Sequence, residues 1–192
     1  DAGEQKIALG HFNISDLATL KAIAEAAREL QVPVIIGTSE GERDFIDVHE
    51  AVAAVKDLRE NHGLEIFLNA DHTHSLEKVK EAVEAGYDAI LFDGGRLPLE
   101  ENIKQTKEVV EYVKSKNPKI LVEGELGYIG GSSVVFKELP KGAAIREQDL
   151  TKPEEASRFV KETKVDLLAP AVGNIHGMLV PSGAEGFAPM NP

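Results

Sequence analysis

The segment LEIFLNADHTHSLEKVKEAVEAGYDAILFDG, residues 64–94, carries the pattern that decides the fold. An apolar run at 64–71 is followed by a helical pattern at 75–86 that ends in glycine, and a second apolar run follows at 87–94. Both runs have the two-sided apolar character of strands that are covered on both faces. The segment therefore predicts a strand, a helix and a second strand parallel to the first.

The same unit recurs along the chain, because apolar runs alternate with amphipathic helical segments almost to the end. Ser15 is the predicted N-cap of the first helix, and Thr151 with Glu154 forms a capping-box pattern at the start of the last. This repeat predicts an α/β protein, either an open doubly wound sheet or a closed (β/α)8 barrel. The predicted strands cover residues 6–12, 32–39, 64–71, 87–94, 119–127 and 165–173, and the predicted helices cover 15–30, about 45–62, 75–86, 98–117 and a segment starting at Thr151.

The residues that follow the strands favour the barrel. An open sheet that binds a nucleotide usually has a glycine-rich turn after its first strand, whereas HFNIS (11–15) stands there in this chain. In a (β/α)8 barrel the strand ends meet at one rim, where such enzymes keep their active sites. We therefore predict a TIM barrel, of which this chain covers about six β/α units. The residues at or just past the strand ends that can bind metal or move protons are His11, Asn13, Ser39, Asp71, His72, Asp93, Glu123, Glu125, Asn174 and His176.

Residues 1–192 are predicted to form one barrel domain that is incomplete at its C-terminus. Six strands do not close an eight-stranded barrel, and the final segment PSGAEGFAPMNP (181–192) has the composition of a loop. We expect about two further β/α units to be missing, and the chain alone to self-associate through open edges. Residues 128–150 are too long for an ordinary connection and are predicted to be a mobile active-site loop.

Composition limits the classes of function. With 192 residues, of which 42% are hydrophobic and 28% charged, the chain has enough apolar sequence for a core. Its net charge of -12 disfavours nucleic acid and anionic membranes as partners, and it has no cysteine for a disulfide or a thiolate metal site. Its apolar runs are too short for a membrane span or a signal sequence. A cytoplasmic protein is therefore expected.

Histidines and acids at several strand ends indicate a metal site. In a chain without cysteine, zinc is usually held by histidine, with carboxylates as further ligands or as partners of the rings. His72 and His176 follow different strands, and Asp71, Asp93 and Glu123 stand at neighbouring strand ends. Each residue alone is better explained as an ordinary loop or turn residue, whereas together they favour a shared metal site.

Six segments resemble, in order, the successive motifs of the class II, metal-dependent ketose-bisphosphate aldolases, which include fructose-bisphosphate and tagatose-bisphosphate aldolases. The resemblance covers about residues 8–178. It implies a (β/α)8 barrel enzyme that reversibly cleaves a ketose 1,6-bisphosphate to dihydroxyacetone phosphate and glyceraldehyde 3-phosphate through a zinc-stabilised enediolate. The segments are HFNISD (11–16), NADHTHS (69–75), AILFDGGRLPLEENIKQTK (89–107), VEGELGYIGG (122–131), TKPEEASRFVKET (151–163) and DLLAPAVGNIHG (166–177).

The resemblance also implies roles for five residues at the metal. His72 and His176 match zinc ligands, and Asp71 matches the acid/base that handles the proton of the substrate's C4 hydroxyl. Asp93 and Glu123 match acidic positions near the metal, which serve either as an alternative cation site or as support for the ligands. The implied cofactor is one catalytic zinc ion, and the family also allows a monovalent cation.

Asn13, Ser39 and Gly177 match positions close to the substrate or its phosphate. The implied partners are a sugar bisphosphate, dihydroxyacetone phosphate and further copies of the same chain, as a dimer or tetramer. The sequence departs from the family in three places. The family's third zinc histidine belongs to a strand that would follow this chain, so the chain alone is expected to bind zinc weakly. The phosphate contacts of that strand and of the next are also missing, and Ser132 and Ser133 stand where many members have an acidic pair.

Two other functions stay open at this point. A non-catalytic barrel subunit or fragment would bind a partner or a sugar phosphate without turnover. A barrel metal-hydrolase would activate water instead, and it is less favoured because the sequence offers no further histidine pair. The residues also do not distinguish fructose from tagatose or a related sugar, since these substrates differ in stereochemistry at one hydroxyl.

Overall fold

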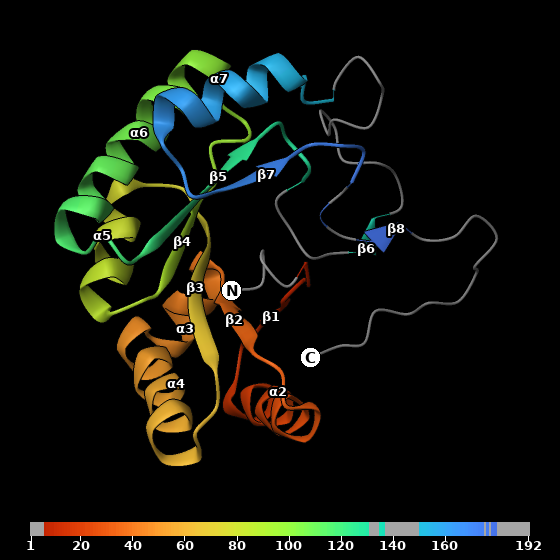
Figure 1. The fold of residues 1–192 in the computed structure, drawn as a ribbon, viewed down its shortest axis with the longest axis vertical. Coiled ribbons are helices and arrows are strands. Elements are labelled where there is room, and N and C mark those ends of the chain that lie inside the picture. The colour runs from red at the N-terminus through yellow and green to blue at the C-terminus, as the bar shows by residue number, and fades with distance from the viewer. Residues whose placement is uncertain (1–5, 131–134, 137–149, 175, 177, 180–192) are drawn as a thin grey trace.

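The computed structural model describes residues 6–130, 135–136, 150–174, 176 and 178–179. Six parallel strands form one sheet in the order β1-β2-β3-β4-β5-β7. The sheet is curved into a half-barrel, which confirms the predicted β/α repeat (Figure 1). The strands are β1 (Gly10–Asn13), β2 (Val34–Thr38), β3 (Ile66–Thr73), β4 (Ala89–Phe92), β5 (Leu121–Leu126) and β7 (Leu167–Pro170).

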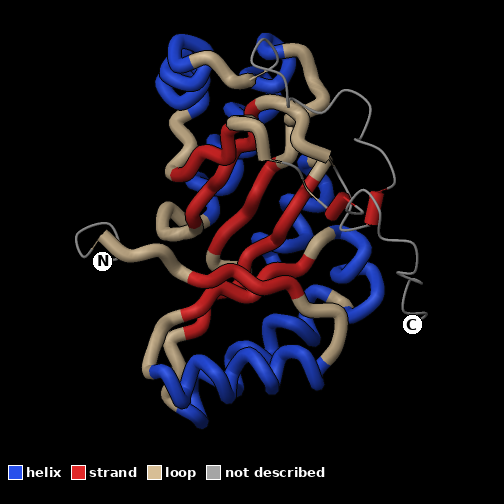
Figure 2. Tube along the Cα trace, turned by 90° about the vertical axis from the view of Figure 1, so that its right-hand side faces the viewer, coloured by secondary structure: helices blue, strands red, loops and turns tan. Residues whose placement is uncertain are grey.

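Helices cover the outer side of the sheet (Figures 1 and 2). At least one helix separates each pair of consecutive strands of this sheet, as a parallel arrangement requires. Within the described residues, none of these helices is both long and apolar enough to cross a membrane. The helices are α2 (Leu17–Leu30), α3 (Glu40–Ile46), α4 (Val48–His62), α5 (Leu76–Ala85), α6 (Leu99–Lys116) and α7 (Pro153–Thr163).

The outward-facing residues of the strands pack against the helices and form the hydrophobic core. Val34, Ile36, Ile66 and Leu68 are each at most 4% exposed. Burying one such side chain contributes roughly 1.5–3 kcal/mol to folding. Alternate residues of a strand face the other side, where Phe67 is 46% exposed. The inner side of the half-barrel therefore leaves room for polar side chains at the strand ends to meet.

The helix predicted at about 45–62 is α4, and the separate helix α3 that precedes it was not predicted. Ser39 begins α3 with a capping box, in which its hydroxyl accepts from the Glu42 amide and the Glu42 carboxylate accepts from the Ser39 amide. Asp47 lies between α3 and α4 with a φ of 76°, which an α-helix does not allow. The pattern SEGE (39–42) was the sequence signal for the earlier start.

Two predicted helix caps were wrong. Asp16, not Ser15, caps α2, and its carboxylate accepts a 2.7 Å hydrogen bond from an amide of the first turn. The Thr151 hydroxyl donates to the Leu126 carbonyl at 2.8 Å and accepts from the Ala171 amide at 3.0 Å. Thr151 therefore joins the ends of β5 and β7. Its hydroxyl bonds to backbone groups at these strand ends instead of capping α7.

A second sheet pairs two short strands, β6 (Val135–Phe136) and β8 (Met178–Leu179), in parallel. Neither strand was predicted from the sequence. Most of the predicted active-site loop at 128–150 lies outside the described residues, including Ser132 and Ser133, and so does the predicted terminal loop. The mobility of residues 128–150 therefore stays a prediction.

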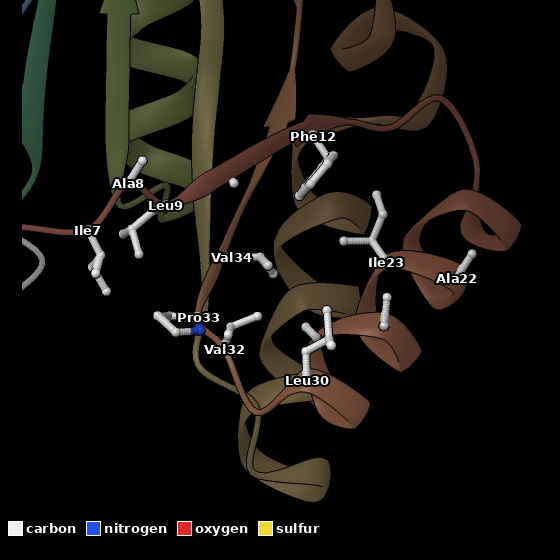
Figure 3. A pocket seen from close by; sticks show the side chains of 13 residues that line it. Ile7, Ala8, Leu9, Phe12, Ala22, Ile23, Leu30, Val32, Pro33 and Val34 are labelled. Carbon is white, nitrogen blue, oxygen red and sulfur yellow. The ribbon is translucent and has the colours of Figure 1, made fainter.

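An apolar groove lies between β1 and α2 (Figure 3). Leu9 and Phe12 line it from the β1 side, Ile23 and Leu30 line it from α2, and Val32 lines it from the segment that leads to β2. Phe12 and Leu30 are 47% and 71% exposed. Since β1 is the first strand in the sheet order, the groove marks one edge of the half-barrel. Self-association through such an edge stays a prediction.

Candidate functional site

Side chains from three neighbouring strands meet at the carboxyl-terminal rim. His72 lies near the end of β3, Asp93 directly follows β4, and Glu125 lies near the end of β5. The Nδ1 atom of His72 is 3.0 Å from Asp93 Oδ2 and 3.7 Å from Glu125 Oε2. One potential ligand atom from each residue lies within 4.8 Å of the others. These three residues, the rim cluster, include two of the predicted metal residues.

His176 lies against the rim cluster. Its ring centroid is 4.6 Å from that of His72, and the two ring planes are tilted by 35°. The His176 amide donates to the carbonyl of Ile129 at 2.8 Å, just beyond β5. Gly130 has a φ of 111°, and a Cβ there would lie 2.9 Å from the His176 carbonyl oxygen. The close approach therefore requires glycine at position 130, and the fold brings together the two histidines predicted to bind zinc.

The donor atoms of the rim cluster fit a divalent cation. Glu125 has a 1% exposed side chain, and its Oε1 has no hydrogen-bond partner among the described residues. Buried carboxylate oxygens almost always have a partner, so this oxygen points to a group that binds there. Gly95 adjoins it, and a Cβ at Gly95 would lie 2.7 Å from Glu125 Oε1 and 3.3 Å from Asp93 Oδ1. Imidazole and carboxylate together are ligands that zinc accepts.

Proton affinities in the cluster are strongly perturbed. Burial lowers the pKa of His72, but the hydrogen bond to Asp93 and the charges of Asp71 and Glu125 outweigh it and raise the value to about 9. Burial raises the pKa of Asp93, and the bond from His72 overcomes this and lowers it. Burial and the Asp93 charge raise the pKa of Glu125. Burial and the His72 charge lower the pKa of His176. A bound cation would therefore displace a proton from His72.

The backbone of β3 is irregular at this point. His72 has a φ of 41°, and the register with β4 shifts between Ala70 and Thr73. A residue other than glycine with positive φ costs roughly 1–3 kcal/mol, and such strain is commonest at functional sites. As a consequence, the side chains of two consecutive residues contact different strand ends. Asp71 contacts β1, whereas His72 contacts the end of β4.

Asp71 is 7% exposed and is held from the neighbouring strand ends. The Asn13 amide donates to Asp71 Oδ2 at 2.9 Å and to Glu42 Oε2 at 3.1 Å. Gly37 leaves space for this arrangement, since a Cβ there would lie 2.3 Å from Asn13 Oδ1 and 2.4 Å from His11 Nε2. Asn13 therefore orients the carboxylate predicted to act as acid/base.

The predicted metal residue Glu123 lies two positions before Glu125 on β5 and outside the rim cluster. Burial raises the pKa of Glu123, and the charge of Asp71 raises it further, while the charge of His72 acts in the opposite direction. Glu125 was named as a strand-end residue but received no metal role from the sequence. The alternation of a strand places both glutamates on the inner side, and Glu125 is the one nearer the rim.

Two of the three predicted substrate residues, Asn13 and Ser39, are among the described residues. Ser39 lies at the end of β2, where its hydroxyl caps α3 and accepts from the Glu42 amide at 3.4 Å. Gly177 lies outside the described residues, so its role stays a prediction. His74, which received no role from the sequence, has its Nδ1 3.7 Å from Asp93 Oδ2, so Asp93 faces two histidines.

Two buried polar residues on α6 belong to the motif at 89–107, but the sequence alone indicated no role for them. Asn102 is 1% exposed and donates from its side-chain amide to the Glu125 carbonyl at 2.8 Å. Thr106 is 0% exposed, and its hydroxyl donates to the Asn102 side-chain carbonyl at 2.9 Å. Their spacing of four residues, about one helical turn, was the sequence signal that the two side chains lie on the same face of the helix. The pair anchors α6 to the backbone of β5 at Glu125.

The sequence model of the family described as fructose-bisphosphate aldolase class-II matches residues 1–188. A protein from Shouchella clausii named 6-phospho-5-dehydro-2-deoxy-D-gluconate aldolase is 39% identical, over 99% of this chain and 62% of that protein. A fructose-bisphosphate aldolase from Staphylococcus aureus is 36% identical, over 99% of this chain and 64% of that protein. The chain thus spans less than two thirds of the length of these curated relatives.

Solved structures of aldolases share the fold. A putative fructose-1,6-biphosphate aldolase from Coccidioides immitis superposes with a TM-score of 0.78 at 30% identity, covering 95% of this chain and 61% of that one. The YdjI aldolase from Escherichia coli K12 gives a TM-score of 0.76 at 28% identity, covering 92% of this chain and 60% of that one. The half-barrel observed here therefore matches about three fifths of each of those two chains.

Proposed function

Because the chain belongs to the class-II fructose-bisphosphate aldolase family, we propose that it carries the metal and acid/base residues of a zinc-dependent aldolase. The reaction would be reversible cleavage of a ketose 1,6-bisphosphate, of fructose or tagatose, to dihydroxyacetone phosphate and glyceraldehyde 3-phosphate. The observation that carries this proposal is the adjacent pair Asp71 and His72, in which Asp71 contacts Asn13 and His72 contacts the acids of the rim cluster.

His72 and His176 are the residues that would hold the zinc ion, with Asp93, Glu123 and Glu125 near it. When bound, zinc supplies Lewis-acid stabilisation of negative charge on a substrate oxygen. The bond between His72 Nδ1 and Asp93 Oδ2 fixes the ring and reserves the other ring nitrogen for the ion. A monovalent cation near Asp93 stays a further prediction.

Asp71 would move the proton in this reaction. Cleavage of the bond between C3 and C4 requires the C4 hydroxyl to lose its proton, and synthesis returns that proton. The bond from Asn13 holds one oxygen of the carboxylate, so the other is available to a substrate hydroxyl. Burial of Asp71 keeps water from competing for it. Asn13 and Ser39, at the ends of β1 and β2, are the described residues proposed to contact the substrate.

A third substrate is worth testing in the same reaction class. The relative from Shouchella clausii is named for 6-phospho-5-dehydro-2-deoxy-D-gluconate, and its identity of 39% is no lower than that of the fructose-bisphosphate aldolase at 36%. The acid/base and metal chemistry proposed above does not depend on which phosphorylated ketose is bound. A homo-oligomeric state and a cytoplasmic location stay predictions.

Steady-state cleavage assays test the proposal. The full-length protein that carries this sequence is loaded with zinc and offered each candidate phosphorylated ketose, and dihydroxyacetone phosphate is detected with a coupled dehydrogenase. We expect release from at least one of the three substrates, abolished by chelation and restored by zinc. Binding of a sugar phosphate without turnover would contradict the proposal and favour a non-catalytic subunit. Cleavage that survives chelation would contradict the metal assignment.

A further inference from the structure

Arg43 is a buried cation behind the ends of β2 and β3. It is 3% exposed and projects from α3, the helix that the Ser39 capping box begins. Its Nη1 donates to the carbonyls of Thr38 and Asp71, the latter at 3.1 Å, and its Nη2 donates to the Thr73 hydroxyl at 3.0 Å. A single guanidinium therefore contacts the residue before His72 and the residue after it.

The strand segment that Arg43 contacts is the irregular one. His72 has positive φ, and the register shift between Ala70 and Thr73 interrupts the ladder with β4. A strained conformation persists only where the surrounding structure fixes it from several directions. The bonds from Arg43 to Asp71 and Thr73 supply that restraint from the β2 side.

Stability alone does not explain an arginine at this position. Burial lowers the pKa of the Arg43 guanidinium, with the charges of Glu40 and Asp71 among those acting in the opposite direction. Burying a cation costs folding free energy, and an apolar side chain of similar volume is often as stabilising or more so. The guanidinium differs from any apolar side chain in its planar set of donors, which fix several acceptors in one geometry.

We propose that Arg43 is a positioning residue of the site. It holds the backbone at 71–73 so that the Asp71 side chain points toward β1 and the His72 side chain points toward the end of β4. The inference rests on the function proposed above, because its first consequence concerns metal binding by His72. Loss of the Arg43 contacts should let His72 relax, and residues that orient a metal ligand typically change metal affinity by about 10–100-fold.

The test compares variants of two arginines, one on α3 and one on α4, that both donate hydrogen bonds to β3. Lysine at position 43 keeps the charge but cannot donate to three acceptors in one plane. Arg59 is a matched control, since its Nε donates to the Ile66 carbonyl at 2.6 Å and its guanidinium pairs with Asp88, at the far end of β3. In zinc competition titrations of the full-length protein, Arg43→Lys should bind zinc about 10–100-fold more weakly, whereas Arg59→Lys should match the unmodified protein.

A second readout separates this inference from the proposed function. The Asp93 amide donates to the Thr73 carbonyl at 2.9 Å, so its hydrogen exchange in zinc-free protein reports on this backbone. Exchange at Asp93 should be faster in Arg43→Lys and unchanged in Arg59→Lys. If the unmodified protein bound no zinc, the proposed function would fail, and the exchange rates would still decide the role of Arg43.

Three results would overturn the inference: unchanged zinc affinity in Arg43→Lys, equal losses in both arginine variants, or unchanged exchange at Asp93. Should Arg43→Lys fail to fold, Thr73→Val removes the acceptor of the Nη2 bond while keeping the branched shape of the side chain. That variant should also weaken zinc binding and speed exchange at Asp93. Wild-type values for both quantities would overturn the inference equally.

Discussion

Replacing His72 with alanine should leave the full-length protein without bound zinc and without aldol cleavage. His72 is the residue that contacts Asp93, Glu125 and His176, so its loss removes the centre of the site. Loss of a ligand itself should exceed the roughly 10–100-fold effect of removing a residue that only orients one. Zinc content after dialysis against a weak chelator measures the result.

His62 supplies a matched control for that variant, since it is an exposed histidine at the end of α4. The variant His62→Ala should retain zinc at the level of the unmodified protein. Stoichiometric zinc in His72→Ala would show that the ion is held elsewhere.

The zinc affinity of the unmodified protein should depend on pH. Below a pKa of about 9 the His72 proton competes with the metal, so zinc affinity should rise about tenfold from pH 7 to pH 8.

Replacing Asp71 with asparagine should lower turnover by about 10²- to 10⁴-fold, the usual contribution of a general acid or base. Asparagine keeps the size of the side chain and its proximity to Asn13 but cannot accept a proton at neutral pH. Zinc should stay bound, because Asp71 contacts Asn13 and not the rim cluster. Turnover and zinc content are measured on the same sample.

Asp88 provides the control for Asp71, because its carboxylate accepts from the Leu68 amide at 2.7 Å and pairs with Arg59, away from the rim. The variant Asp88→Asn should lower thermal stability and leave turnover per folded molecule unchanged. Loss of zinc from Asp71→Asn, with a normal rate once zinc is restored, would make Asp71 a structural residue.

The repeat of strands and helices could be predicted from the sequence because its causes are local. The apolar run at 64–71 and the helical pattern that stops at Gly86 each determine an element within a few residues. Parallel strands then bring their ends to one rim, which is why the sequence alone could group His72, Asp93 and His176.

Features that depend on contacts between distant elements could not be predicted in the same way. The choice of Glu125 over Glu123 for the rim cluster depends on the register of β4 with β5. The contacts of Arg43 depend on the packing of α3 behind β3. No sequence pattern around a single arginine in a helical segment indicates that its side chain is buried. The strained φ of His72 follows from the register shift in β3, which no local propensity favours.

Anomalous diffraction at the zinc absorption edge, from crystals of the full-length protein grown with zinc, would locate the metal relative to His72 and His176. We predict one strong peak about 2.0–2.1 Å from a nitrogen of His72, the usual zinc to imidazole distance, with His176 also bound to it. Asp93 and Glu125 should lie beside the peak, and Asp71 should lie near it without binding it. An active protein whose zinc peak lies away from His72, or which shows no zinc peak, would contradict the account.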